Sequence, residues 1–380
     1  MDKQPFVIDS TCFQQLIDVL RGRGYRVIGP TVRDDAITYD EIGSVSDLPI
    51  GWTDKQDGGT YQLERRSDDA YFGYVVAAQS WKRLLHPPTA RIWQAQRTEQ
   101  GFAVVPDEGD QPPYAFLGVR ACELCAIAIQ DRVFMGGAFV DPIYARNREG
   151  VFIVAMNCTQ AGGTCFCVST GTGPNASTGF DLALTEVVDA DSHYFLAEVG
   201  TERGASVLDD MLHRDATEDE IARAHGLVAT VAKHMGRTVD LSNTKQQLYE
   251  SYESPHWEEI AQRCLMCGNC TMVCPTCFCA TVEDTTDLTG DHAERRRLWD
   301  SCFTMDFSYI HGGSVRYTPK ARYRQWLTHK MATWIDEFGM RGCVGCGRCI
   351  TWCPVGIDIT AELKAIQESH PVQHLQEEQP

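Results

Sequence analysis

Two cysteine runs near the C-terminus decide how this chain is interpreted. Residues 264–275 read CLMCGNCTMVCP, and residues 343–354 read CVGCGRCITWCP. Each run has the spacing C-x2-C-x2-C-x3-C and ends in proline, which is typical of proteins with two [4Fe-4S] clusters. The fourth cysteine of such a run binds the other cluster. We therefore predict two crossed ligand sets, one of Cys264, Cys267, Cys270 and Cys353, and the other of Cys343, Cys346, Cys349 and Cys274.

A zinc site is the alternative interpretation of a C-x2-C pair. Two complete runs, each closed by Cys-Pro, favour iron–sulfur clusters instead. A long insert separates the runs, and residues 319–338 within it have the apolar spacing of a helix. We predict an α-helical ferredoxin-type domain at residues 251–380, similar to the ferredoxin modules of multisubunit oxidoreductases.

The N-terminal part predicts an α+β or α/β cluster-binding domain. Residues 1–110 have a mixed α/β pattern with loops at 54–59 and 106–113, and residues 111–250 predict an α/β domain. Within the latter, strands are predicted at 114–119 and 151–156, with a helix at 124–134. Cysteines follow both strands and a glycine-rich turn, which suggests a third [4Fe-4S] cluster held by Cys122, Cys158, Cys165 and Cys167. Ordinary small core residues are the alternative, and Cys125 lies close enough to compete as a ligand.

Three further cysteines have no place in these sets. The tetrapeptide Thr-Cys-Phe-Cys occurs at residues 164–167 and again at 276–279. The second copy contributes Cys277 and Cys279, and Cys302 follows later. These thiols could bind another cofactor, handle sulfur, or lie buried and inert. Two basic stretches remain: residues 295–297, interpreted as solvated surface, and residues 316–324, a surface that could offset cluster charge or dock a partner.

Composition narrows the class of protein. The 380 residues include 17 cysteines and carry a net charge of −18, which disfavours binding to nucleic acid or to an anionic membrane. We find no secretory signal and no membrane-spanning run, so we expect a cytoplasmic protein whose thiols stay reduced. No nucleotide fingerprint, HExxH motif or hydrolytic triad is visible. We therefore expect no flavin, nickel or nicotinamide on this chain, and no catalysis by the chain alone.

Several longer stretches resemble one known family, the beta subunits of cytosolic sulfhydrogenases, which are NAD(P)-linked bidirectional [NiFe]-hydrogenases. The A subunit of anaerobic sulfite reductase is a related protein. The resemblance covers roughly residues 114–360 and is carried by residues 118–124, 157–158, 163–167, 172–174, 179–186, 274–279, 299–302 and 342–358.

The resemblance implies a role within a complex. The partners would be the large and small [NiFe]-hydrogenase subunits and a subunit that binds FAD and NAD(P). This chain would relay single electrons between that complex and an acceptor such as polysulfide or ferredoxin. Two alternatives remain open: the A subunit of an anaerobic sulfite reductase, and a stand-alone ferredoxin-like carrier.

Overall fold

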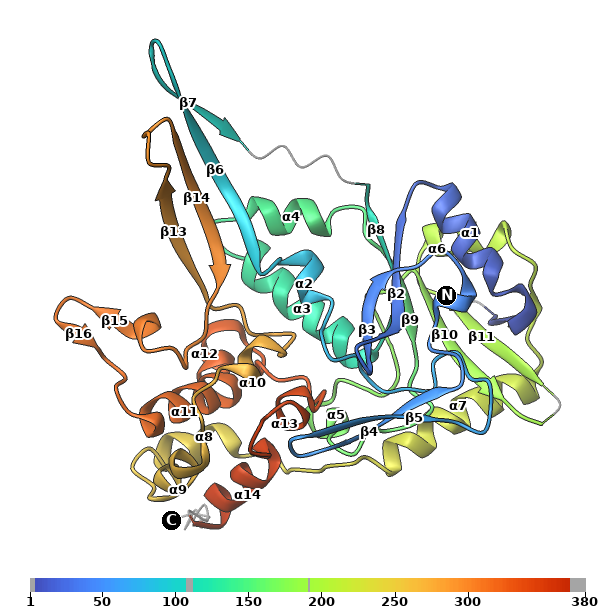
Figure 1. Cartoon of the computed structure of the whole chain (residues 1–380). Helices are drawn as coiled ribbons and strands as arrows, with labels where there is room; N and C mark the ends of the chain where they lie inside the picture. Colours follow the sequence, from blue (N-terminus) through green and yellow to red (C-terminus); the bar gives the residue numbers. More distant parts are fainter. Residues whose placement is uncertain (1–3, 107–111, 191, 370–380) are drawn as a thin grey trace, which may run out of the picture.

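The computed structural model describes residues 4–106, 112–190 and 192–369. Its largest element is an eight-stranded sheet with the order β12-β1-β11-β10-β9-β8-β2-β3 (Figure 1). The strands are β1 (Phe6–Asp9), β2 (Arg26–Arg33), β3 (Ala36–Glu41), β8 (Tyr114–Val119), β9 (Phe152–Met156), β10 (Leu182–Val188), β11 (His193–Val199) and β12 (Arg214–Asp215).

The middle of this sheet is parallel and apolar. Strand β8 pairs in parallel with β2 and β9, and β9 pairs in parallel with β10, whereas the outer pairs are antiparallel. All five residues of β9 are buried, as expected for a strand covered on both faces. The helices of this half are α1 (Gln14–Gly22), α2 (Lys82–Leu85), α3 (Ala121–Met135), α4 (Pro142–Arg148), α5 (Cys167–Thr170), α6 (Glu202–Asp209) and α7 (Glu218–Lys233).

The sequence prediction was right for the elements next to the cysteines and wrong for one loop. Strands β8 and β9 and helix α3 lie where strands at 114–119 and 151–156 and a helix at 124–134 were predicted. Residues 54–59 belong instead to a hairpin of β4 (Trp52–Asp57) and β5 (Thr60–Arg65). The strand was missed because its inward-facing residues, Asp54 and Gln56, are polar yet buried. The other predicted loop, 106–113, lies largely outside the described residues.

The C-terminal part is mainly helical. Its helices are α8 (Thr244–Glu250), α9 (His256–Arg263), α10 (Asn269–Met272), α11 (Pro319–Thr328), α12 (Trp334–Phe338), α13 (Arg348–Thr351) and α14 (Ile359–Ser369). The helix predicted at 319–338 forms, but a π-helical turn, η4 (His329–Thr333), interrupts it between α11 and α12. Single π turns inside α-helices are frequent at functional sites. None of the helices in the described part of the chain has the length and apolar content needed to span a bilayer.

Strands also occur in the part predicted to be α-helical. Strands β13 (Ala280–Thr286) and β14 (His292–Trp299) pair with β6 (Thr89–Thr98) and β7 (Gly101–Pro106) in a second sheet, which projects from the molecule (Figure 1). A short hairpin, β15 (Tyr309–Ile310) with β16 (Gly313–Ser314), follows. The chain therefore has an α+β fold in which distant segments share sheets. The division at residues 110 and 250 stays a prediction, although strands from both sides of residue 110 share the large sheet.

Candidate iron–sulfur sites

The first predicted ligand set, which we call site 1, surrounds one cavity. Cys264, Cys267, Cys270 and Cys353 all line it. Burial raises the pKa of Cys270, and the neighbouring thiols Cys264, Cys353 and Cys267 raise it further. Cys267 is exposed, so site 1 lies at the protein surface. The remaining wall is mostly apolar and includes Phe303, Tyr323, Trp326, Ile357 and Ile359.

The second set, site 2, lies deeper. Burial is the main cause of the raised pKa of Cys349, and the neighbouring thiols of Cys343, Cys346 and Cys274 raise it further. The structure thus brings Cys274 to the second run and Cys353 to the first, which is the grouping that the crossed assignment requires. Cys349 also lines the cavity of site 1, so the two sites are neighbours.

The two cysteine runs share an unusual backbone conformation. Met266 and Gly345 occupy equivalent positions between the first two cysteines, and both have positive φ (59° and 62°). Gly268 and Gly347, after the second cysteine, also have positive φ (76° and 78°). These left-handed residues make each run curl back on itself, so that three thiols converge. Residues other than glycine adopt this conformation at a cost, so Met266 indicates that the turn itself is required.

A buried lysine lies against site 2. The side chain of Lys330, on the π-helical turn, is 3% exposed. Its Nζ lies 3.2 Å from the Sγ of Cys274 and donates to the hydroxyl of Thr276 at 3.0 Å and to the carbonyl of Gly342 at 2.9 Å. A buried cation beside thiols suits a centre that carries negative charge, since an isolated buried ammonium would be very unfavourable.

The third set, site 3, forms where the parallel strands end. Cys122 follows β8 at the start of α3, Cys158 follows β9, Cys165 lies in the turn before α5, and Cys167 is the first residue of α5. The pKa of Cys167 is raised to about 12, mainly by burial and then by the neighbouring thiols of Cys158 and Cys346. Cys346 belongs to site 2, and its carbonyl lies 3.9 Å from the Sγ of Cys165. Sites 2 and 3 are therefore adjacent as well.

The competing thiol, Cys125, packs against the same buried cluster as Cys122, Cys165 and Cys167, but its pKa shows no influence of their thiols. Burial alone raises its pKa, whereas neighbouring thiols contribute to the raised pKa of Cys122. Two glycines leave room around the other sulfurs. A Cβ at Gly162 would lie 3.3 Å from the Sγ of Cys165, and one at Gly173 would lie 3.1 Å from the Sγ of Cys167. This space and the four converging thiols fit a cluster held by the predicted set without Cys125.

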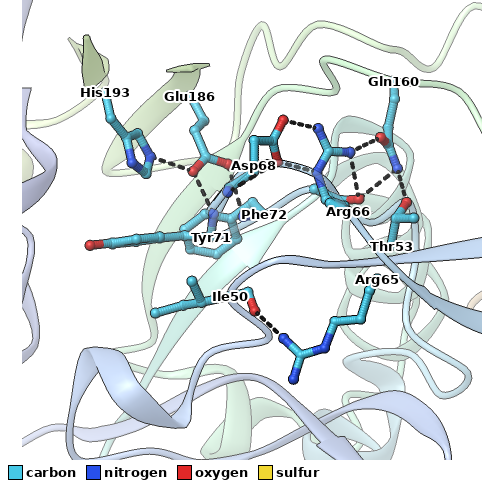
Figure 2. Close-up of polar contacts among 12 residues, drawn as sticks. Ile50, Thr53, Arg65, Arg66, Asp68, Tyr71, Phe72, Gln160, Glu186 and His193 are labelled. Carbon is cyan, nitrogen blue, oxygen red and sulfur yellow. Dashed lines mark hydrogen bonds and ion pairs between the residues drawn. The ribbon is translucent and has the colours of Figure 1, made fainter. Parts of the chain in front are cut away.

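One segment that covers site 3 is held by a polar network shown in Figure 2. Glu186 accepts from the backbone N–H groups of Tyr71 and Phe72, at 2.6 and 2.8 Å. Arg66 donates to Gln160, which itself donates to the carbonyl of Gly73. Since Gln160 lies two residues after Cys158, the network ties this segment to the backbone of site 3. The following residues, Val75 and Val76, then pack with its cysteines.

Arg120 completes the wall of site 3. It is 1% exposed and donates to the carbonyls of Phe72, Tyr74 and Val75, and to that of Asn157. Burial raises the pKa of Cys158, and the guanidinium of Arg120 opposes that increase. The cation therefore favours the thiolate form that a metal ligand requires.

A buried ion pair connects the cysteine-rich loop of site 2 to the large sheet. Arg348 lies between Cys346 and Cys349 and pairs with Glu123, the residue after Cys122; both side chains are 1% exposed. Arg348 also donates to the carbonyl of Ala77 at 2.8 Å. Glu123 accepts from the Tyr39 hydroxyl and the Trp81 indole, at 2.8 and 3.0 Å. This network spans from site 2 to site 3.

Sequence reasoning missed these buried ions and misinterpreted others. Arg322, predicted to lie on a docking surface, is 4% exposed and donates to the carbonyls of Phe303 and Tyr317. Arg297, predicted to be solvated, is 9% exposed and pairs with Asp141. Arg322 thus holds backbone carbonyls and Arg297 holds a carboxylate, so neither side chain is free to form a docking surface. Arg120 and Arg348 could have been noticed because each lies close to a predicted ligand in sequence, whereas Lys330 has no such signal.

The close packing between the cysteine loops and the sheet domain predicts the effect of one small substitution. A Cβ at Gly347 would lie 2.5 Å from the carbonyl oxygen of Thr164. At Gly290, which has a similar φ of +72°, a Cβ would meet nothing within 4 Å. We expect Gly290→Ala to cost about 1–2 kcal/mol from backbone strain alone. Gly347→Ala should cost about 1–3 kcal/mol more because of overpacking. Anaerobic urea unfolding measures both losses, and equal losses would contradict the proposed contact.

Comparison with known proteins defines the class. The family model of the 4Fe-4S dicluster domain matches residues 263–357, which contain both cysteine runs. Among the described residues, no group of three or more Cys, His, Asp or Glu side chains is close enough to hold a single metal ion directly. The chain is an iron–sulfur protein of the electron-transfer type, with a 4Fe-4S dicluster domain in its C-terminal part.

A relative narrows the class further. The chain is 28% identical over 364 residues to Sulfhydrogenase 2 subunit beta of Pyrococcus furiosus, covering 95% of this chain and 98% of the relative. This likeness along nearly the whole chain confirms the resemblance to sulfhydrogenase beta subunits, including the first 110 residues, where the motifs gave little signal. The chain is thus similar to a sulfhydrogenase beta subunit along nearly its whole length. No solved structure matches it.

Proposed function

We propose that the chain holds three [4Fe-4S] clusters and relays single electrons between a hydrogenase-type complex and an acceptor. Bound clusters would accept and donate one electron at a time. Site 1 would use Cys264, Cys267, Cys270 and Cys353; site 2 would use Cys343, Cys346, Cys349 and Cys274; and site 3 would use Cys122, Cys158, Cys165 and Cys167.

The observation that carries this proposal is the continuous order of the three sites. Cys349 of site 2 also lines the cavity of site 1, and the carbonyl of Cys346 contacts Cys165 of site 3. Site 1 has an exposed ligand, Cys267, whereas Cys122, Cys165 and Cys167 of site 3 are buried. Such a row gives electrons a path from the surface into the protein.

The protein's own residues prepare each site for clusters. Buried cations lie at site 2 (Lys330 and Arg348) and at site 3 (Arg120), where they offset thiolate charge. The wall of site 1 is mostly apolar, although its ligand Cys267 is exposed. Charge, hydrogen bonds and exposure are the properties that set cluster potentials, so the three sites should differ in potential.

The partners follow from the relative's name and from the resemblance. We propose the large and small [NiFe]-hydrogenase subunits and a subunit that binds FAD and NAD(P). The acceptor would be polysulfide or ferredoxin, and the compartment the cytoplasm. We propose no flavin, nickel or nicotinamide site on this chain and no catalysis by the isolated chain.

The third cluster yields a direct prediction. Cys165→Ser should lower the iron content from about twelve atoms per chain to about eight, because one cube of four irons loses a ligand. Cys125→Ser is the matched control, since it removes a nearby thiol outside the proposed set, and it should leave the iron content unchanged. Iron analysis of the anaerobically purified full-length chain, with EPR spectra, measures both. Loss of iron in Cys125→Ser alone would require a different ligand set.

The relay role is tested with the purified, cluster-loaded chain. Given hydrogen or NADPH alone, its clusters should keep their visible absorbance, because conversion of a two-electron donor into single electrons needs a two-electron cofactor on a partner. Addition of the hydrogenase subunits should then allow hydrogen to bleach the absorbance. Rapid bleaching without a partner would reveal a catalytic centre on this chain and refute the relay role.

A further inference from the structure

Three thiols lie beside sites 1 and 2 but outside the twelve proposed ligands. Cys277 hydrogen-bonds through its thiol to the sulfur of Cys274, a proposed ligand of site 2. Cys279 and Cys302 form a separate pair at the base of the projecting sheet. Strand β13 begins at the residue after Cys279, and β14 ends three residues before Cys302. The pair is thus positioned by a hairpin and not by a cluster loop.

The hairpin geometry brings the two thiols together and directs a backbone N–H at one of them. Ala280 pairs with Trp299, and the N–H of Asp300 donates to the carbonyl of Cys279 at 2.9 Å. The chain then turns so that the thiols of Cys279 and Cys302 lie next to each other and the backbone N–H of Cys302 is directed at the Sγ of Cys279. The backbone N–H favours negative charge on the Sγ of Cys279, so the two sulfurs of the pair are not equivalent.

The surroundings favour a thiolate at Cys279. The hydrogen bond with the Cys302 thiol lowers the pKa of Cys279 to about 7, and Lys330 contributes in the same direction. The same hydrogen bond raises the pKa of Cys302. A second buried lysine, Lys82, donates to the carbonyl of Cys277 at 3.1 Å. Thiols with a lowered pKa that are partly accessible are the reactive ones, and Cys279 and Cys302 are both partly exposed.

We propose that Cys279 and Cys302 form a thiol–disulfide exchange centre for low-molecular-weight disulfides, with Cys279 as the nucleophile and Cys302 as the resolving thiol. The Cys279 thiolate attacks one sulfur of the disulfide; a new S–S bond forms, the old one breaks, and the first thiol leaves with the electron pair and takes a proton from water. Cys302 then loses its proton to water and attacks Cys279, which releases the second thiol. The chain is oxidised by two electrons, and the disulfide is reduced to two thiols.

A fourth cluster is the competing use of these residues. Only Cys277, Cys279 and Cys302 remain for it, and Cys277 already contacts Cys274, so a cube here would need a ligand other than cysteine. The exchange centre needs no metal. The exchange centre rests on the proposed function in one respect: the thiols of sites 1 and 2 are assigned to clusters and are therefore not part of the centre.

The test uses the full-length, cluster-loaded chain and glutathione disulfide under anaerobic conditions. After alkylation of free thiols, peptide mapping should find Cys279 linked to Cys302, with two glutathione thiols released per chain. Cys302→Ser should instead trap glutathione on Cys279, because the resolving thiol is missing. Cys279→Ser should abolish both products, and Cys12→Ser, a control distant from all three sites, should behave as the wild type.

Iron analysis of the same samples separates this inference from the proposed function. Cys279→Ser and Cys302→Ser should keep the wild-type iron content. Loss of iron in either variant would assign these thiols to a cluster and overturn the exchange centre. Absence of a Cys279–Cys302 link and of trapped glutathione, in a chain with full iron content, would also overturn it. A wild-type chain without iron would refute the clusters of the proposed function, while the trapping result would still decide the exchange centre.

Discussion

Replacing Arg348 by methionine is expected to destabilise the folded chain by about 3–5 kcal/mol, because it leaves the buried carboxylate of Glu123 without its cation. Both side chains are 1% exposed, so water cannot compensate for the lost partner. The carbonyl of Ala77 would also lose its donor. The free energy of anaerobic urea unfolding measures the loss.

The control for Arg348→Met is a surface ion pair. Lys55 pairs with Glu64, and the side chain of Lys55 is 72% exposed. Lys55→Met should cost less than about 1 kcal/mol. The double variant Arg348→Met with Glu123→Gln should recover part of the loss, because the buried charge is removed together with its partner. Similar losses for Arg348→Met and Lys55→Met would show that the buried pair does not join the two halves as described.

The secondary structure next to several of the predicted ligand cysteines could be predicted from the sequence. The apolar runs at residues 114–119 and 151–156 predicted β8 and β9, and parallel strands end at the same edge of a sheet. Because a cysteine follows each of these strands, the sequence placed Cys122 and Cys158 at strand ends, and the parallel pairing of β8 with β9 brings those ends together. The spacing of the two C-terminal runs likewise predicted that Cys274 and Cys353 exchange places, and the structure groups the thiols in that way.

The remaining features depend on contacts between distant segments. Strand β14 pairs with β6, from a segment about 200 residues earlier, and no local pattern specifies such pairing. Hairpin β4–β5 was missed because strands are recognised by apolar residues on the buried face, and here the buried face carries the polar residues Asp54 and Gln56. Arg297 and Arg322 were interpreted as surface residues because a charged side chain is expected to lie in water unless its partner is known. Arg322, for example, is bound by backbone carbonyls, which no residue pattern reveals.

The second large effect is expected on the reduction potential of the cluster proposed at site 2, when Lys330 is replaced. Lys330→Met should shift the reduction potential of the cluster proposed at site 2 to more negative values by at least about 60 mV, which corresponds to about 1.4 kcal/mol for one electron. The physical reason is charge: reduction adds an electron, and the ammonium 3.2 Å from the Sγ of Cys274 stabilises the more negative state. At 3% exposure the interaction is poorly screened by solvent. A redox titration followed by EPR measures the shift.

Lys82→Met is the matched control for that measurement. Lys82 is also a buried lysine, at 5% exposure. Its Nζ contacts the carbonyls of Met272 and Cys277 and the ring of Trp299, and among the described residues it makes no hydrogen bond to a proposed ligand sulfur. Because the charge lies farther from the site 2 thiols, its removal should shift the potential in the same direction by a smaller amount. Iron content in both variants must equal that of the wild type for the comparison to hold. A larger shift in Lys82→Met than in Lys330→Met, with full iron in both, would mean that the π-helical turn does not serve to hold its cation at the Cys274 sulfur.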